Sequence, residues 1–107
     1  MGIIKIMVSL KKLQKKIYQN KLDKGFNTTD IYKEFCLIHE ELSEACRSHY
    51  KKQYDVGEEL ADVAIYLLGL SEILNINLEK EIVQKIKKNH KRVYQRIGGV
   101  MTRIKDA

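Results

Sequence analysis

Two acidic clusters near the middle of the chain hold the side chains that are best able to do chemistry. The first comprises Glu40, Glu41 and Glu44, and the second contains Glu59 and Asp62. Glu41 and Glu44 are three positions apart, as are Glu59 and Asp62, so each pair shares one face of a helix. If the two helices pack side by side, four carboxylates converge and repel one another unless a cation lies between them. This all-oxygen ligand set favours Mg²⁺, with Mn²⁺ as a substitute, over zinc.

Other metal chemistries lack their ligands in this sequence. The Glu-x-x-His motif of di-iron bundles is absent. His39 and Glu40 begin like a zinc-protease motif, but Ser43 occupies the position of its second histidine. Cys36 and Cys46 have neither the spacing of a metal site nor that of a disulfide framework, and we expect them to be reduced, buried thiols. Redox iron chemistry and zinc hydrolysis are therefore disfavoured.

A third group of polar residues follows near the carboxyl end. Lys85, Asn89 and Arg92 recur at steps of four and three, so they share one helix face. The net charge is +6, and the basic residues concentrate in 5–24 and 80–103. Two interpretations remain open, a solvated basic surface or a clamp for an anion beside the acids. A metal ion together with an anion clamp is what phosphoryl chemistry requires.

The elements that must position these residues are predicted to be helices. The 107 residues include no proline and are rich in Lys, Leu, Ile and Glu, which indicates one all-α domain over 1–107. Apolar residues recur at steps of three and four, which predicts four helices in a bundle. The predicted helices cover about 7–24, 30–50, 55–74 and 77–97.

Capping residues mark most of the predicted ends. Ser9 and Asn77 are good N-caps, Thr28, Thr29 or Asp30 can cap the second helix, and Gly25 suits a left-handed helix terminus. Asp55 is expected to cap the third helix in a capping box with the glutamate three positions later.

The third predicted helix is apolar on all sides from 60 to 70, which is typical of a central helix. Asp62 lies inside this run and needs a partner, because burying a lone carboxylate costs several kcal/mol. Glu72 is interpreted as an ordinary surface charge. A chain this small has a limited core, so oligomerisation is expected to add burial. The tail 98–107 is expected to be flexible or to lie at a subunit interface.

Taken together, the three polar groups resemble the signature of a known family, the MazG-like proteins among the all-α nucleoside triphosphate pyrophosphohydrolases. The resembling motifs are Glu40-Glu41-x-x-Glu44, Glu59-x-x-Asp62 and Lys85-x-x-x-Asn89-x-x-Arg92. The resemblance extends from the turn at 24–26 through Arg92. It implies a Mg²⁺-dependent enzyme, built as a dimer or tetramer of helical bundles, that cleaves nucleoside triphosphates into a monophosphate and pyrophosphate. It also implies a role in clearing abnormal or excess nucleotides.

The resemblance assigns a role to each motif residue. The implied metal ligands are Glu41, Glu44, Glu59 and Asp62. The implied catalytic residues are Glu40 and Glu41, with Glu40 as an outer acid or as the group that orients the attacking water. Lys85 and Arg92 are implied to contact phosphates, and Asn89 the phosphate or the sugar. The residues that recognise the base are not evident, because Tyr18, Phe26, His39 and Tyr66 suit either stacking or core packing.

Two alternatives remain open. A phosphoribosyl-ATP pyrophosphohydrolase shares the acid pattern and would accommodate Asp62-Val63-x-x-Tyr66. A non-catalytic basic helical module would bind nucleic acid, but it leaves the acids near the core without a role, so nucleic acid is not the expected partner. Residues 1–10 show no signal peptide or membrane span, so the expected location is cytoplasmic and no membrane partner is expected.

Overall fold

The computed structural model describes residues 7–105 and contains four helices followed by a strand pair. The elements are α1 (Leu10–Lys24), α2 (Ile31–Tyr50), α3 (Val56–Ile73), α4 (Leu78–Lys91), β1 (Val93–Ile97) and β2 (Val100–Lys105). The prediction of four helices is confirmed, whereas the two strands were not predicted. The expectations for residues 1–6 and 106–107 lie outside the described residues.

Most helix ends follow the predicted local signals. The side chains of Ser9, Asp30 and Asn77 each accept a hydrogen bond from a first-turn backbone N–H. Gly25 adopts a left-handed φ of 69° and closes α1. The capping box at Asp55 is wrong, because its side chain makes no capping hydrogen bond and instead accepts one from the Ser48 hydroxyl. This bond joins the end of α2 to the start of α3.

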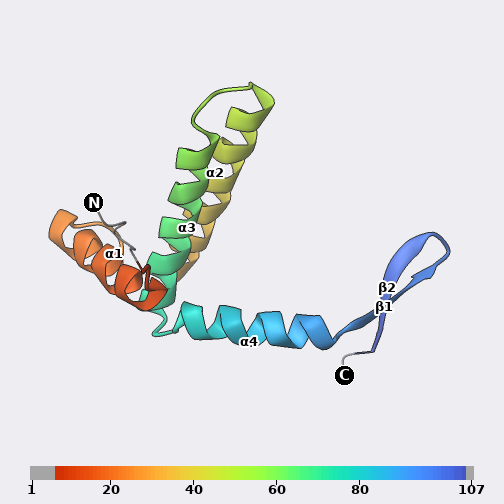
Figure 1. Cartoon of the computed structure of the whole chain (residues 1–107). Coiled ribbons are helices and arrows are strands. Elements are labelled where there is room, and N and C mark those ends of the chain that lie inside the picture. The colour runs from red at the N-terminus through yellow and green to blue at the C-terminus, as the bar shows by residue number, and fades with distance from the viewer. Residues whose placement is uncertain (1–6, 106–107) are drawn as a thin grey trace, which may run out of the picture.

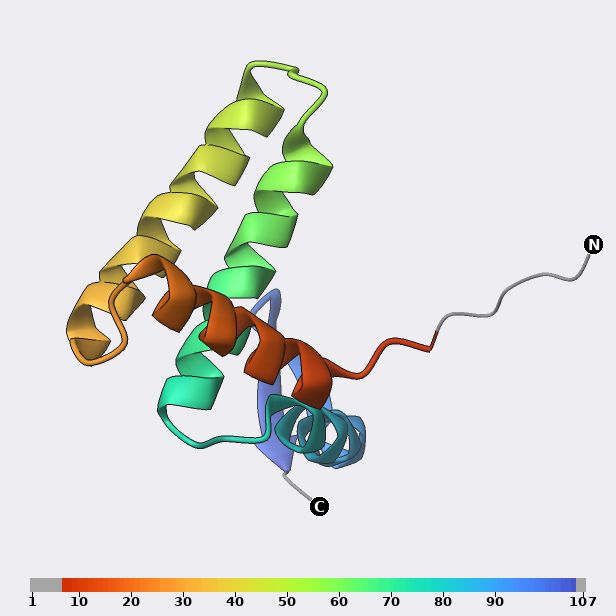
Figure 2. The ribbon, with the colours of Figure 1, turned by 90° about the vertical axis from the view of Figure 1, so that its left-hand side faces the viewer.

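Helices α2 and α3 form an antiparallel pair, and α1 crosses the carboxyl-terminal half of α3 (Figures 1 and 2). The buried apolar residues are Leu68 and Leu70, in the carboxyl-terminal half of α3, and Ala45, near the carboxyl end of α2. Gly69 permits the close approach of α1, because a Cβ at this position would lie 3.3 Å from Cγ2 of Ile17. Helix α1 therefore packs against one end of the α2–α3 pair, and no third helix within residues 7–105 lies against the other end (Figure 2).

Gln14 ties α1 to the start of α4. This side chain is only 1% exposed. Its Nε2 donates to Glu72 Oε2 at 3.2 Å and to the Ile76 carbonyl at 2.7 Å, and its Oε1 accepts from the Leu78 N–H at 2.9 Å. The interpretation of Glu72 as a surface charge is therefore wrong, because it is half-buried and hydrogen-bonded. These bonds set the direction in which α4 leaves the other helices.

Helix α4 extends away from the other three helices (Figure 1). Residues 80–91 are exposed along their whole length. The radius of gyration is 17.9 Å, whereas a compact chain of this length has a radius of about 13 Å. Within one chain, three helices pack together, and α4 has a bare apolar face at Ile82, Val83 and Ile86.

The described chain is mostly helical, as predicted, but the prediction that the fourth helix reaches residue 97 is wrong. Helix α4 ends at Lys91, and β1 and β2 form an antiparallel hairpin in which Ile97 faces Val100. Gly98 and Gly99 have φ values of 57° and 80°. Positive φ at both central residues is the geometry of a tight hairpin turn, which these glycines adopt without strain. The described part of the tail is therefore ordered as strand.

Several residues expected in the core are exposed in the single chain. Leu60, Ile65 and Leu67 on α3 are exposed to solvent, so other elements do not cover α3 on all sides. Cys36 and Cys46 are free thiols, as predicted, but they are exposed rather than buried. No helix among residues 7–105 is both long enough and apolar enough to cross a membrane.

Candidate metal-binding site

Three of the predicted ligands converge between α2 and α3. Glu41 and Glu44 from α2 and Glu59 from α3 each present a carboxylate oxygen, and these oxygens lie within 4.8 Å of one another. Glu41 and Glu59 are half-buried, whereas Glu44 is exposed. The antiparallel pairing of the two helices and the three-residue spacing on α2 produce this convergence. We call these three residues the acidic cluster.

Burial and, after it, repulsion between the acids raise the pKa of two members of the cluster. For Glu41, burial is the largest cause of the raised pKa, followed by the negative charges of Glu44, Asp62 and Glu59. For Glu59, burial is again first, followed by Asp55 and then by the other acids nearby. Asp62 is half-buried and close enough to act on both groups electrostatically. The cluster is therefore a place where bound positive charge, as a proton or a cation, is favourable.

Glu59 provides a second indication of a missing partner. Its Oε2 atom is shielded from solvent, and no hydrogen-bond partner for it is present among the described residues. A shielded acceptor without a partner carries a free-energy cost, which is larger when the group is charged. A cation coordinated by this oxygen would remove that cost.

The cluster matches the chemistry of a small hard cation. Its donors are all carboxylate oxygens, which Mg²⁺ and Mn²⁺ prefer. Adjacent oxygens around an octahedral Mg²⁺ lie roughly 3 Å apart, because each Mg–O bond is about 2.0–2.1 Å. Side-chain rotation of the exposed Glu44 would provide the modest contraction that is required. The residues present therefore fit the ion.

We expect the stability of the metal-free protein to fall as the pH rises above about 4.3, the ordinary pKa of glutamate. Glu41 and Glu59 have raised pKa values, so the folded state binds more protons than the unfolded state in this window. The measurement is the melting temperature from pH 4 to 7 in EDTA, compared with the Glu41→Gln variant, whose fall should be smaller. Mn²⁺ should raise the wild-type melting temperature most at the upper end of this range. Parallel wild-type and variant curves would contradict the repulsion described above.

Glu40 and the predicted phosphate-binding residues lie outside the acidic cluster. Glu40 is exposed and lines a surface pocket of about 280 Å³ together with Glu44 and Arg47. Lys85, Asn89 and Arg92 lie on α4 or immediately after it, and α4 leads away from the α2–α3 pair (Figure 1). A single chain therefore does not bring the basic group to the acids.

Sequence reasoning did not find a buried ion pair two helical turns from the cluster. The Lys21 ammonium, on α1, contacts Glu34 Oε1, on α2. The same ammonium lies 5.7 Å from the centroid of the Tyr66 ring on α3. One signal was present, because Glu34 precedes Glu41 by seven positions and so shares its helix face. Its partner lies thirteen residues earlier, at a distance that helical periodicity does not predict.

Comparisons of the chain with models of known protein families, with curated proteins and with solved structures found no match.

Proposed function

We propose that this chain is a Mg²⁺-dependent nucleotide pyrophosphohydrolase of the MazG-like type, which cleaves nucleoside triphosphates between the α and β phosphates. The observation that carries the proposal is the acidic cluster, with its converging carboxylates and the unpartnered oxygen of Glu59. The reaction class is suggested by the order of the three sequence motifs, which resembles that of the MazG-like family. A function in clearing abnormal or excess nucleotides follows from the same resemblance.

The chain's own residues have distinct parts in this proposal. Glu41, Glu44 and Glu59 would hold the ion, and Asp62 would be the fourth ligand. When bound, Mg²⁺ neutralises phosphate charge and lowers the pKa of a coordinated water. Glu40, at the exposed edge of the cluster, orients the attacking water towards the α phosphorus. The leaving pyrophosphate then departs on the opposite side, as an in-line displacement requires.

The missing basic half of the site is assigned to a second copy of the chain. Residues 78–105 contain nine Lys and Arg against two acids, whereas the face formed by α2 and α3 holds the acidic cluster. The bare apolar face of α4 and the exposed leucines of α3 also need cover. In a homodimer, α4 of one copy would pack on the α2–α3 pair of the other and complete a four-helix bundle. This arrangement would bring Lys85, Asn89 and Arg92 to the partner's acids, where they would contact the phosphates.

The proposal is tested with the purified full chain and a panel of ribo- and deoxyribonucleoside triphosphates, with pyrophosphate release as the readout. Turnover is expected with Mg²⁺ or Mn²⁺ and should be abolished by EDTA. Turnover of no member of the panel, with either ion, would overturn the assignment as a triphosphate pyrophosphohydrolase.

Experiments with the same purified protein distinguish two rival assignments. Exclusive hydrolysis of phosphoribosyl-ATP would identify the pyrophosphohydrolase of that substrate instead. The exposed basic segment 78–105 favours the nucleic-acid alternative, which predicts binding of DNA or RNA that weakens steeply with salt. Salt-dependent binding without any nucleotide hydrolysis would replace the enzyme assignment.

A further inference from the structure

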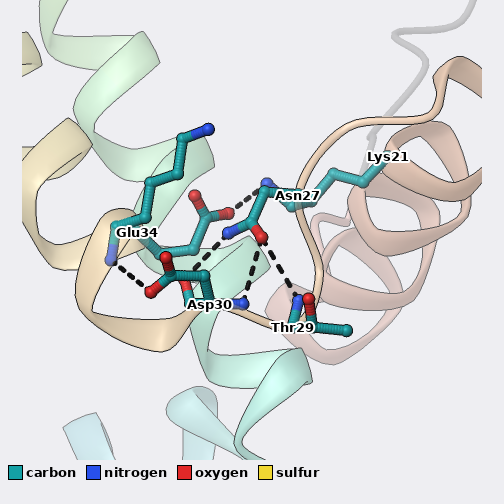
Figure 3. A network of polar contacts seen from close by, with 6 residues as sticks. Lys21, Asn27, Thr29, Asp30 and Glu34 are labelled. Atoms are coloured by element: carbon teal, nitrogen blue, oxygen red, sulfur yellow. Dashed lines mark hydrogen bonds and ion pairs between the residues drawn. The ribbon is translucent and has the colours of Figure 1, made fainter.

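The buried ion pair of Lys21 and Glu34, at the junction of α1, α2 and α3, leaves one carboxylate oxygen unpaired. Glu34 is 1% exposed, and its Oε1 is occupied by the Lys21 ammonium. Its Oε2 is shielded from solvent, and no hydrogen-bond partner contacts it within residues 7–105. Figure 3 shows Lys21 reaching from α1 to Glu34 beside the loop that Asn27 and Asp30 stabilise. A buried carboxylate with one unused oxygen is costly unless a donor reaches it.

Two pockets meet at this ion pair. One, of about 320 Å³, is lined by Glu34, Lys21, Phe26 and Tyr66 together with neighbouring residues. The other, of about 120 Å³, shares Lys21, Phe26 and Tyr66 and adds apolar surface from Ile17. Phe26 is 55% exposed, so its ring is available to a ligand. The pockets thus combine aromatic faces with a carboxylate acceptor and an ammonium donor, the composition of a small-molecule site.

The pockets and the acidic cluster lie along the same two helices, α2 and α3. Glu34 and Glu41 are seven residues apart on α2, which corresponds to about 10 Å along the axis. Tyr66 is one turn beyond Asp62 on α3. Tyr66 lines both pockets, and its pKa is raised first by burial and then by the charges of Glu41 and Glu34. A nucleotide whose phosphates lie at the cluster can therefore extend its base towards Glu34.

We propose that these pockets hold the base of the substrate and that Glu34 selects cytosine over uracil by accepting a hydrogen bond from the 4-amino group. This inference rests on the function proposed above. Both residues of the ion pair line the larger pocket, so rotation about χ3 of Glu34, a soft torsion, would present one carboxylate oxygen to the base while Lys21, with three donors, keeps contact with the other. Cytosine offers a donor there, and Lys21 can donate to the adjacent ring nitrogen. Uracil has a carbonyl oxygen at the same position, which the carboxylate repels.

The chemistry of the pocket that Glu34 lines supports this choice. Acceptance of a hydrogen bond from the cytosine amino group is the usual way in which an acidic side chain recognises a base edge. A site built to accept this bond should reject the analogue that lacks the donor by at least about 10²-fold in kcat/KM, because the buried acceptor then stays unpaired.

The test compares kcat/KM for CTP and UTP, which differ at the 4-position and at the protonation of the adjacent ring nitrogen. Wild-type protein should prefer CTP by about 10²-fold or more. Glu34→Gln should reduce the preference to less than about tenfold, since an amide both accepts and donates. Glu34→Asp, which keeps the charge but shortens the side chain, should also weaken it. Glu72→Gln makes the same change at a carboxylate hydrogen-bonded to Gln14 and should preserve the wild-type ratio.

The outcomes separate this inference from the proposed function. Equal use of CTP and UTP by wild-type protein, or an unchanged ratio in both Glu34 variants, would overturn the inference while leaving the pyrophosphohydrolase intact. If no triphosphate is hydrolysed, the binding of CMP and UMP measured by calorimetry decides instead. Tighter binding of CMP that is lost in Glu34→Asp would support the base site alone, and equal binding or none would overturn it. If Glu34→Gln fails to fold, the wild-type ratio and the aspartate variant still decide.

Discussion

Replacing Glu41 by glutamine should lower kcat by at least about 10²-fold while raising the melting temperature of the metal-free protein. Loss of a residue that only supports a metal ligand typically costs 10–100-fold in activity or affinity, so loss of a ligand itself should cost more. The stability should change in the opposite direction. The raised pKa of Glu41 shows that its negative charge is unfavourable in the folded state without a cation. Activity assays and thermal melts in EDTA measure the two effects.

The matched control is Glu58→Gln, the same change at an exposed glutamate on the first turn of α3. This variant should keep near-normal turnover, because Glu58 lies outside the acidic cluster. A further measurement is the stabilisation by Mn²⁺, which should shrink in Glu41→Gln and remain in the control. Near-normal turnover of Glu41→Gln would show that Glu41 is not a ligand.

Replacing Ile86 by aspartate should dissociate the proposed homodimer and remove activity. Ile86 is 62% exposed in the single chain and lies on the apolar face of α4. Burying an unpaired carboxylate at an interface costs several kcal/mol, which corresponds to a dimer dissociation constant at least about 10²-fold higher. Light scattering after gel filtration should show a monomer, and the helical content should be unchanged. Turnover should fall because Lys85 and Arg92 no longer reach the acids of the other copy.

Gln84→Asp provides the control for this experiment. It introduces the same charge two positions away, on the opposite face of α4. The Gln84 variant should stay dimeric and active. A monomeric wild-type protein with full activity, or an Ile86→Asp variant that remains an active dimer, would rule out the composite site.

The acidic cluster was predictable because its information is local. Residues three apart on a helix share a face whatever the tertiary structure, so Glu41 and Glu44 had to point together. The caps at Ser9, Asp30 and Asn77 are likewise chosen by neighbouring backbone groups. Only the approach of Glu59 from α3 required tertiary structure, and the short connection between α2 and α3 made an antiparallel pair the natural arrangement.

The features that the sequence did not predict depend on long-range contacts or on competing local signals. The pairing of Lys21 with Glu34 joins two helices, and the direction of α4 depends on the hydrogen bonds of Gln14. The hairpin is different, because its signal was present. Two glycines between stretches rich in β-branched and aromatic residues are typical of a tight hairpin turn, but the glycines were interpreted as the end of a helix.

The measurement that tests the central claim most directly is phosphorus NMR of a nucleoside triphosphate during incubation with the full chain and Mg²⁺. Cleavage at the acidic cluster predicts the growth of nucleoside monophosphate and pyrophosphate signals in equal amounts, and EDTA should stop it. CTP is the first substrate to use, given the pocket beside Glu34. Formation of nucleoside diphosphate and inorganic phosphate, or the absence of any Mg²⁺-dependent change, would contradict the assignment of the acidic cluster as a pyrophosphohydrolase site.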